Sequence, residues 1–213
     1  MRVVAVPVKS LAASKGRLAG VLTDAERAAL TLAMLGDVLD AALAQAGWDT
    51  WVISRDRRVL RKASGAGAKP LEETGFSLGA AVRQVELGVP EGALAVVLGD
   101  LPWLDSAQLG AALERAGSVV AAPAASDGGT NLLLRRPPSV IPARFGRASF
   151  ARHAAEAARA GVEFVEVRTP GLQRDVDRPK DLAALVSDAN RSRARAVCLE
   201  MRVAERLVRP APA

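Results

Sequence analysis

The chain has 213 residues, of which 50% are hydrophobic and 24% charged, and its 29 Lys and Arg exceed its 23 Asp and Glu. This composition is typical of a globular protein with a sizeable core and excludes extensive disorder, while the modest positive charge favours anionic ligands. A single cysteine, Cys198, excludes an internal disulfide or a cysteine metal cluster and fits a cytoplasmic, reducing location.

Membranes and nucleic acids are not expected as partners. No stretch reaches about 18 apolar residues, and the first residues are typical of a strand rather than of an export signal. Only 3% of the residues are aromatic and none is tyrosine, which disfavours recognition by stacking on bases. The positive charge by itself leaves nucleic acid and a phosphorylated small molecule equally possible, and a small molecule is the expected partner.

The first predicted element is a strand from Val3 to Val8, a β-branched apolar run. The loop that follows carries Lys9, Lys15 and Arg17 around Gly16. Cations and backbone N–H groups in such a loop can wrap a polyphosphate, and a solvated basic loop is the alternative. The loop matches neither the Walker pattern nor GxGxxG.

Thr23 and Glu26 then predict a capping box and a long helix that Gly47 ends. The elements predicted after it are a strand over 50–54, a helix over 57–63, a weak strand near Pro70 and a helix over 77–87.

The strand over 94–98 is apolar throughout, as expected of a strand buried on both faces. Gly99 and Pro102 interrupt it, so that it stops at Asp100. Because ligands lie beyond the carboxyl ends of strands in open α/β sheets, Asp100 is placed where a substrate or metal binds. The alternative is that Asp100 only begins a turn.

In the second half, the predicted elements are a helix over 106–116, strands over 119–122, 132–134 and 164–167, a helix over 149–160 and a helix that begins at Pro179. The loop D-G-G-T-N precedes one of these strands. Its glycines let the backbone approach a ligand closely, so we expect Thr130 and Asn131 to point at that ligand.

Ser149 begins one of these helices, with Gly146 three residues before it and Arg147 between them. This arrangement predicts an anion site at the helix N-terminus, and simple N-capping by Ser149 is the alternative. His153 has no second histidine or cysteine to complete a zinc site, so we expect it to support the loop.

Asp175 and Asp177 flank Val176 in a segment that we expect to be extended, with both carboxylates on one side. With Asp100 and the basic loop, they are the groups that metal-assisted phosphoryl or nucleotidyl transfer requires. The alternation of strands and helices predicts a single α/β domain over residues 1–188 with a mostly parallel sheet, followed by a basic carboxyl-terminal helix or tail over 189–213.

Six motifs occur in order along the chain: V-P-V-K-x5-K-G-R-L, A-E-R-A-A-L-x3-M-L-x-D-V, G-D-L-P-W-L, D-G-G-T-N-L-L, F-G-x2-S-F-x-R-H and P-G-L-x2-D-V-D-x-P-x-D-L. In these motifs the chain resembles the 2-phospho-L-lactate guanylyltransferase family (CofC and its phosphoenolpyruvate-using relative FbiD) of coenzyme F-420 biosynthesis. The resemblance implies a Rossmann-like fold of the nucleotide-diphospho-sugar transferase (GT-A) type.

The implied reaction joins GTP to a phosphorylated three-carbon acid and releases pyrophosphate. The acid is 2-phospho-L-lactate, phosphoenolpyruvate or 3-phosphoglycerate, and a homodimer is one assembly that the resemblance suggests. Carried over by position, the GTP-binding residues are Lys9, Lys15, Arg17 and Asp100, of which Lys15, Arg17 and Asp100 are catalytic. The Mg²⁺ ligands would be Asp100, Asp175 and Asp177, and the acid would bind at Thr130, Gly146 and Ser149.

Two alternatives stay open. One is another nucleotidyltransferase, of the molybdenum-cofactor or sugar-phosphate type, although the G-G-x-S-x-R-M-G loop of those enzymes is absent. The other is a non-catalytic nucleotide-binding or RNA-binding protein, which would use the positive charge alone. Ser77-Leu78-Gly79 stands where the family usually shows G-L-N, which leaves the choice of base open.

Overall fold

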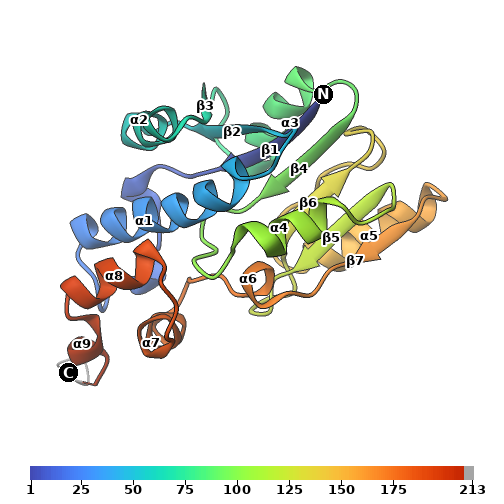
Figure 1. Ribbon diagram of the computed structural model, residues 1–213. Helices are drawn as coiled ribbons and strands as arrows, with labels where there is room; N and C mark the ends of the chain where they lie inside the picture. Colours follow the sequence, from blue (N-terminus) through green and yellow to red (C-terminus); the bar gives the residue numbers. More distant parts are fainter. Residues whose placement is uncertain (209–213) are drawn as a thin grey trace.

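A computed structural model describes residues 1–208, in which helices flank both faces of a seven-stranded sheet (Figure 1). The strand order is β3-β2-β1-β4-β6-β5-β7. The strands are β1 (Arg2–Pro7), β2 (Asp49–Ser54), β3 (Lys69–Glu72), β4 (Ala93–Val97), β5 (Val119–Pro123), β6 (Thr130–Arg135) and β7 (Phe164–Glu166). The predicted α/β class with a mostly parallel sheet is confirmed.

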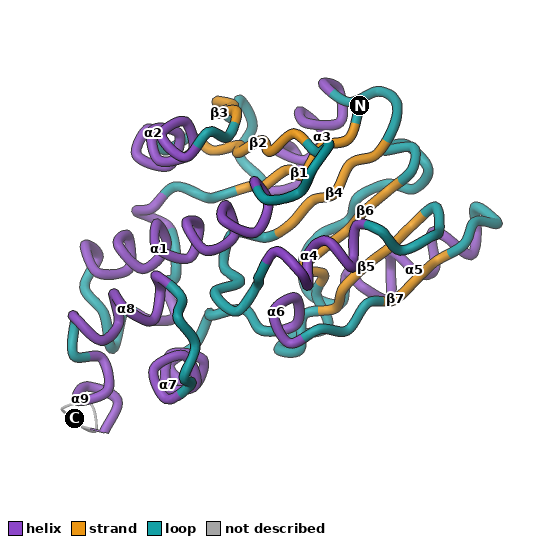
Figure 2. The backbone as a smooth tube through the Cα atoms, in the orientation of Figure 1, coloured by secondary structure: helices purple, strands orange, loops and turns teal. Residues whose placement is uncertain are grey.

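Strand β6, which lies between β4 and β5 (Figure 2), is the exception, because it runs antiparallel to both of them. Only residues 124–129 separate β5 from β6, and so short a connection permits a hairpin but not a parallel crossover. As a result β6 begins at the edge where its neighbours β4 and β5 end. Thr130, the first residue of β6, therefore lies at the same edge as Asp100.

The alternation of side chains along the strands divides the core between the two faces. In β1, Val4 and Val6 pack toward α1 (Asp24–Leu43), α2 (Arg57–Ala66) and α4 (Ser106–Leu113). Val3 and Ala5 pack toward α3 (Leu78–Gly88) on the opposite face. Next to α3 on that face, α5 (Ser149–Arg159) covers β5 and β6.

The predicted capping box is confirmed at the start of α1, where Thr23 and Glu26 satisfy each other's backbone N–H groups. The helix ends at Leu43, before the predicted Gly47, which lies in the following turn with a φ of 73°. Ser77 caps α3 by accepting a hydrogen bond from Ala80 N, so this serine has a structural role at the position that departs from the family pattern.

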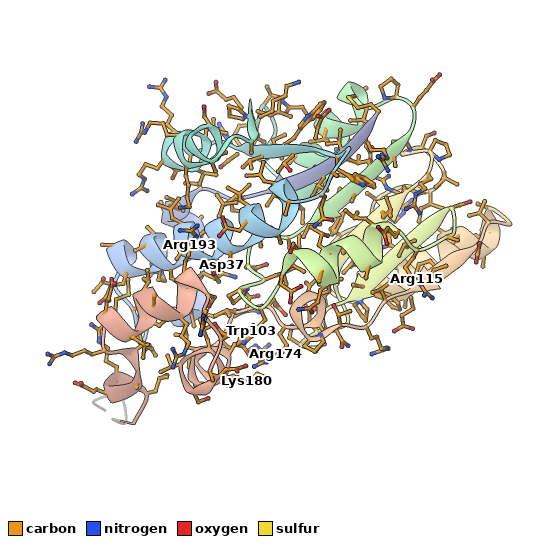
Figure 3. All side chains as sticks on the ribbon, in the orientation of Figure 1. Asp37, Trp103, Arg115, Arg174, Lys180 and Arg193 are labelled. Carbon is orange, nitrogen blue, oxygen red and sulfur yellow. The ribbon has the colours of Figure 1, made fainter. Side chains whose placement is uncertain are left out.

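Beyond residue 188, the expected basic segment forms two short helices, α8 (Arg193–Glu200) and α9 (Val203–Val208). They pack with α7 (Pro179–Ser187) on the outer face of α1, where Met34, Leu182 and Cys198 are buried together. Asp37 of α1 accepts hydrogen bonds from the backbone N–H groups of Arg193 and Ala194 at the start of α8 (Figure 3). Residues 209–213 of the expected tail lie outside the described residues.

Across residues 1–208, the helices include none that is both long enough and apolar enough to cross a membrane.

The sequence pattern did not predict α6 (Pro170–Gln173), a single turn that is too short to show helical periodicity. Its Gly171 N donates to Gln108 Oε1 at 2.7 Å, and its Leu172 carbonyl accepts from Asn131 Nδ2 at 2.9 Å. The Gln173 carbonyl accepts from Ala125 N at 3.0 Å. These contacts fix the start of the segment that carries Asp175 and Asp177.

Gly171→Ala tests how tightly α6 is seated. A Cβ at this position would lie 2.5 Å from the Trp103 carbonyl oxygen and 2.8 Å from Leu104 Cα, and these backbone atoms cannot rotate away. We expect a loss of about 1–3 kcal/mol in the free energy of unfolding, measured by urea denaturation. Gly20→Ala is the control, because its Cβ meets nothing within 4 Å, and its change should stay within about 0.5 kcal/mol. Equal midpoints for the two variants would contradict the close packing of α6.

Candidate functional site

The loop after β1 turns Lys15 inward. It contains two 3₁₀ turns, Leu11–Ala13 and Gly16–Leu18, anchored by the buried Leu11 and Leu18. Lys15 lies between the turns with φ 52° and ψ 37°, a left-handed conformation that costs a non-glycine residue free energy and is found most often at functional sites. Only 6% of its side chain is exposed.

Lys15 joins two carboxylates that come from distant parts of the chain. Its Nζ lies 2.5 Å from Asp100 Oδ2, just beyond β4, and 2.7 Å from Asp177 Oδ1, just before α7. Burial by itself would lower the pKa of Lys15, but the two carboxylates outweigh this effect and raise it. For Asp177, burial would raise the pKa, and the charges of Lys15 and Arg17 lower it overall. The ammonium group therefore stays charged at neutral pH.

Two further cations border this ion pair. Arg17 Nη1 lies 3.8 Å from Asp177 Oδ2, with 65% of the Arg17 side chain exposed. Lys9 is also exposed, and its charge contributes to the lowered pKa of Asp177. The predicted basic loop thus places one cation between carboxylates and two toward solvent, where an anion can reach them.

Asp175 lies beside this cluster with a different partner. Ser126 Oγ is 3.3 Å and 3.4 Å from its two carboxylate oxygens. Burial raises the pKa of Asp175 to about 6, and the negative charges of Asp100 and Asp177 contribute to the rise. Between the two aspartates, Val176 is buried and its N–H donates to the Asp100 carbonyl at 3.3 Å. This backbone bond holds the 175–177 segment against the end of β4.

The two carboxylate oxygens of Asp100 are in different environments. Its Oδ2 binds Lys15, whereas its Oδ1 is buried without a hydrogen-bond partner. Among residues 1–208, no three His, Cys, Asp or Glu side chains converge as a metal site made by protein alone. Mg²⁺ commonly takes only one or two carboxylates and completes its shell with phosphate oxygens and water. An unpartnered Asp100 oxygen near Asp175 and Asp177 fits such a site.

A second, uncharged cluster lies at the start of β6 and α5. Thr130 Oγ1 is 2.9 Å from Ser149 Oγ and 3.1 Å from His153 Nδ1, and all three side chains are buried. His153 Nε2 accepts a hydrogen bond from Arg144 N at 2.9 Å. Sequence reasoning assigned Thr130 and Ser149 to one site but missed the link to His153. The four-residue spacing of Ser149 and His153 on one helix face is the signal that predicts it.

The loop before α5 gives Ser149 its position. Gly146 has a φ of 122° and Ala148 one of 54°, and Ser149 N donates to the Gly146 carbonyl at 3.0 Å. Ser149 is the first residue of α5, and the N-cap position belongs to Ala148, which forms no side-chain cap. Simple N-capping by Ser149, the alternative interpretation, is therefore wrong.

The prediction that Asn131 points at a ligand is also wrong. Asn131 is 1% exposed, and its amide donates to the Leu172 carbonyl. Both Thr130 and Asn131 belong to β6, but the register between β5 and β6 is irregular at this point: Ala122 pairs with Leu132 and Pro123 pairs with Thr130, so that Asn131 is skipped. This irregularity turns Asn131 toward α6 and leaves Thr130 toward α5.

A brace made of Trp103, Arg174 and Asp188, which the sequence did not predict, connects the segment after Asp100 to the segment before Asp175. The guanidinium of Arg174 lies 3.8 Å from the centre of the Trp103 ring, and both side chains donate to Asp188, Trp103 Nε1 at 2.9 Å and Arg174 Nη1 at 3.1 Å (Figure 3). Trp103 follows Asp100 closely and Arg174 precedes Asp175. The brace therefore helps to fix the positions of the Asp100 and Asp175 carboxylates relative to each other.

The family model described as "Guanylyl transferase CofC like" matches residues 1–207. A relative from Rubrobacter xylanophilus, named phosphoenolpyruvate guanylyltransferase, is 40% identical over 186 residues, which cover 84% of this chain and 91% of the relative. A relative from Phenylobacterium zucineum, named 3-phospho-D-glycerate guanylyltransferase, is 39% identical over 181 residues, which cover 79% of this chain and 82% of the relative.

Solved structures share the fold. A protein from Desulfovibrio desulfuricans G20, described as a nucleotide-diphospho-sugar transferase, superposes with a TM-score of 0.78 at 20% identity and covers 97% of this chain and 99% of its own. A cytidylyltransferase from Leptospira borgpetersenii gives a TM-score of 0.58 at 11% identity, with 100% and 99% covered. The predicted nucleotide-diphospho-sugar transferase type of fold is confirmed.

Asp175 and Asp177 should affect stability in opposite directions. Because the pKa of Asp175 is raised to about 6, the charged form is disfavoured on folding, and stability is lost as pH rises through this value. Asp175→Asn should therefore stabilise the metal-free protein at about pH 8 by about 1 kcal/mol, or about 2–4 °C in Tm, after allowance for solvent screening. The gain should vanish below about pH 4, where both folded and unfolded chains are protonated.

The matched variant is Asp177→Asn. The pKa of Asp177 is lowered, so its charge stabilises the folded state at neutral pH and the variant should have a lower Tm at about pH 8. Thermal unfolding in the presence of a chelator measures both variants. Shifts of the same sign would show that the charges around Lys15 do not control these two positions.

Proposed function

Because the chain belongs to the CofC-like guanylyl transferase family, we propose that it joins the guanylyl group of GTP to a phosphorylated three-carbon acid and releases pyrophosphate, as a step in coenzyme F-420 biosynthesis. The chain is a nucleotidyltransferase. The observation that carries the proposal is the family match over residues 1–207, which includes both the charged and the uncharged cluster. Phosphoenolpyruvate and 3-phosphoglycerate, which the relatives' names mention, are candidate acids together with 2-phospholactate.

On the nucleotide side, Lys9, Lys15 and Arg17 would bind the triphosphate. Their charges offset the negative charge that develops on the leaving pyrophosphate. Lys9 and Arg17 face solvent, whereas Lys15 is held between Asp100 and Asp177. Mg²⁺ would bind at Asp100, through its unpartnered Oδ1, together with Asp175 and Asp177. When bound, the ion would neutralise phosphate charge and hold the reacting groups in line.

On the acceptor side, Thr130, Gly146 and Ser149 would receive the acid. A phosphate oxygen of the acid attacks the α-phosphorus of GTP, a new P–O bond forms, and the bond to the β-phosphate oxygen breaks. The phosphate of the acid is already largely ionised near neutral pH, so the step needs no general base. Since β4 and β6 are neighbours in the sheet, Thr130 lies beside the strand that leads to Asp100.

The test is pyrophosphate release with Mg²⁺ and GTP, and with ATP for comparison, against each of the three acids. We expect release with GTP and at least one acid, and ³¹P NMR should show the new pyrophosphate linkage in the product. Asp100→Asn should lower turnover by at least about 100-fold, since it removes charge that holds the metal.

Asp40→Asn is the control, because Asp40 lies on the exposed side of α1 and binds Arg193 at the protein surface. It should keep wild-type turnover. Release with none of the acids would overturn the proposed function, and wild-type turnover in Asp100→Asn would overturn the role of Asp100.

A further inference from the structure

His153 is the only histidine in the chain and is fully buried behind the uncharged cluster. Its two ring nitrogens contact the backbone N–H of Arg144 and the hydroxyl of Thr130. A backbone N–H can only donate, so the hydrogen bond from Arg144 N makes His153 Nε2 an acceptor. In a neutral imidazole one nitrogen accepts and the other carries the proton, so the proton must lie on Nδ1. His153 Nδ1 therefore donates to Thr130 Oγ1, 3.1 Å away.

The direction of the His153–Thr130 hydrogen bond fixes the direction of the next one, between Thr130 and Ser149. Among the described residues, Thr130 Oγ1 has two partners, His153 Nδ1 and Ser149 Oγ at 2.9 Å. Since His153 donates to Thr130, the buried Thr130 hydroxyl can satisfy its own hydrogen only by donating to Ser149 Oγ. Ser149 Oγ then accepts, and its own hydrogen is the one donor that the chain of hydrogen bonds leaves free.

We propose that His153 is a positioning residue for guanylyl transfer: through Thr130 it holds the Ser149 hydroxyl as a hydrogen-bond donor to an ionised oxygen of the acceptor acid. The inference rests on the proposed function, in which Thr130 and Ser149 receive that acid. Ser149 is the first residue of α5, where the helix dipole favours a negative group, so an anionic oxygen fits the free donor.

The groups around the His153 ring keep its orientation fixed and its imidazole neutral. Phe145 packs edge-on against His153, with 5.6 Å between ring centres, which limits rotation of the imidazole. Burial lowers the pKa of His153 to about 4, and the charges of Arg135 and Arg152 contribute, against the opposing effect of Glu156. The imidazole is therefore neutral at physiological pH, as the hydrogen-bond pattern requires.

Two variants separate positioning from simple structural support, because each retains one of the two hydrogen bonds of His153. In His153→Asn the amide nitrogen can replace Nδ1 and still donate to Thr130. In His153→Gln the longer side chain can replace Nε2 and accept from Arg144 N, but the donor to Thr130 is lost. We expect KM for the acid to rise at least about tenfold in His153→Gln and less than about threefold in His153→Asn. KM for GTP should stay within about twofold in both.

A similar rise in KM for the acid in both variants, or a rise in KM for GTP as well, would overturn the proposal and indicate a structural role. Thermal unfolding of both variants accompanies the kinetics. If a variant does not fold, the NMR measurement on the wild-type protein tests the proposal in its place.

In the wild-type protein, the single histidine gives one imidazole signal set in two-bond ¹H–¹⁵N NMR spectra. We expect a proton on Nδ1, none on Nε2, and no titration between about pH 8 and about pH 5. A proton on Nε2 would overturn the proposal. If the wild-type protein turns over no acid, the proposed function fails on its own, and the NMR result still decides the tautomer.

Discussion

The candidate site depends on one buried cation, Lys15, which holds two carboxylates that are 85 and 162 residues away along the chain. Buried charges are tolerated only when they are paired, so the three side chains constrain one another's positions. The left-handed backbone of Lys15, the backbone bond between Val176 and Asp100, and the contacts of α6 all serve this arrangement. The charged part of the site is therefore assembled by the folded chain itself.

The antiparallel strand β6 brings the uncharged cluster to the same edge. In an all-parallel sheet, the first residue of a strand lies at the edge opposite to the ends of the others. Because the short connection over 124–129 reverses the chain, Thr130 instead begins where β4 and β5 end. The same connection carries Ser126, which contacts Asp175, and so it joins the two clusters.

Local patterns were sufficient to predict where Asp100 and Lys15 lie, because a strand break and a loop after a strand can be recognised from neighbouring residues. They failed for Asn131, because β6 begins two residues before the predicted start at Leu132, and an irregularity in its register with β5 then turns Asn131 toward α6. The Trp103, Arg174 and Asp188 brace and the bond from Arg144 to His153 join residues that no local pattern relates. Such contacts appear only once the chain is folded.

The two clusters differ in what they can distinguish. Electrostatic attraction to Lys15 or Arg17 depends mainly on distance and charge, so it does not distinguish one polyphosphate from another. A hydrogen bond from a buried hydroxyl depends on direction and weakens steeply when the angle is poor. The acids in question all carry a phosphate and a carboxylate and differ in the position of the phosphate, in a hydroxyl group or in a double bond, so total charge separates them poorly. In the proposed function, discrimination among them should therefore arise at Thr130, Ser149 and His153, where the structure specifies direction, and not at the cations proposed to bind the nucleotide.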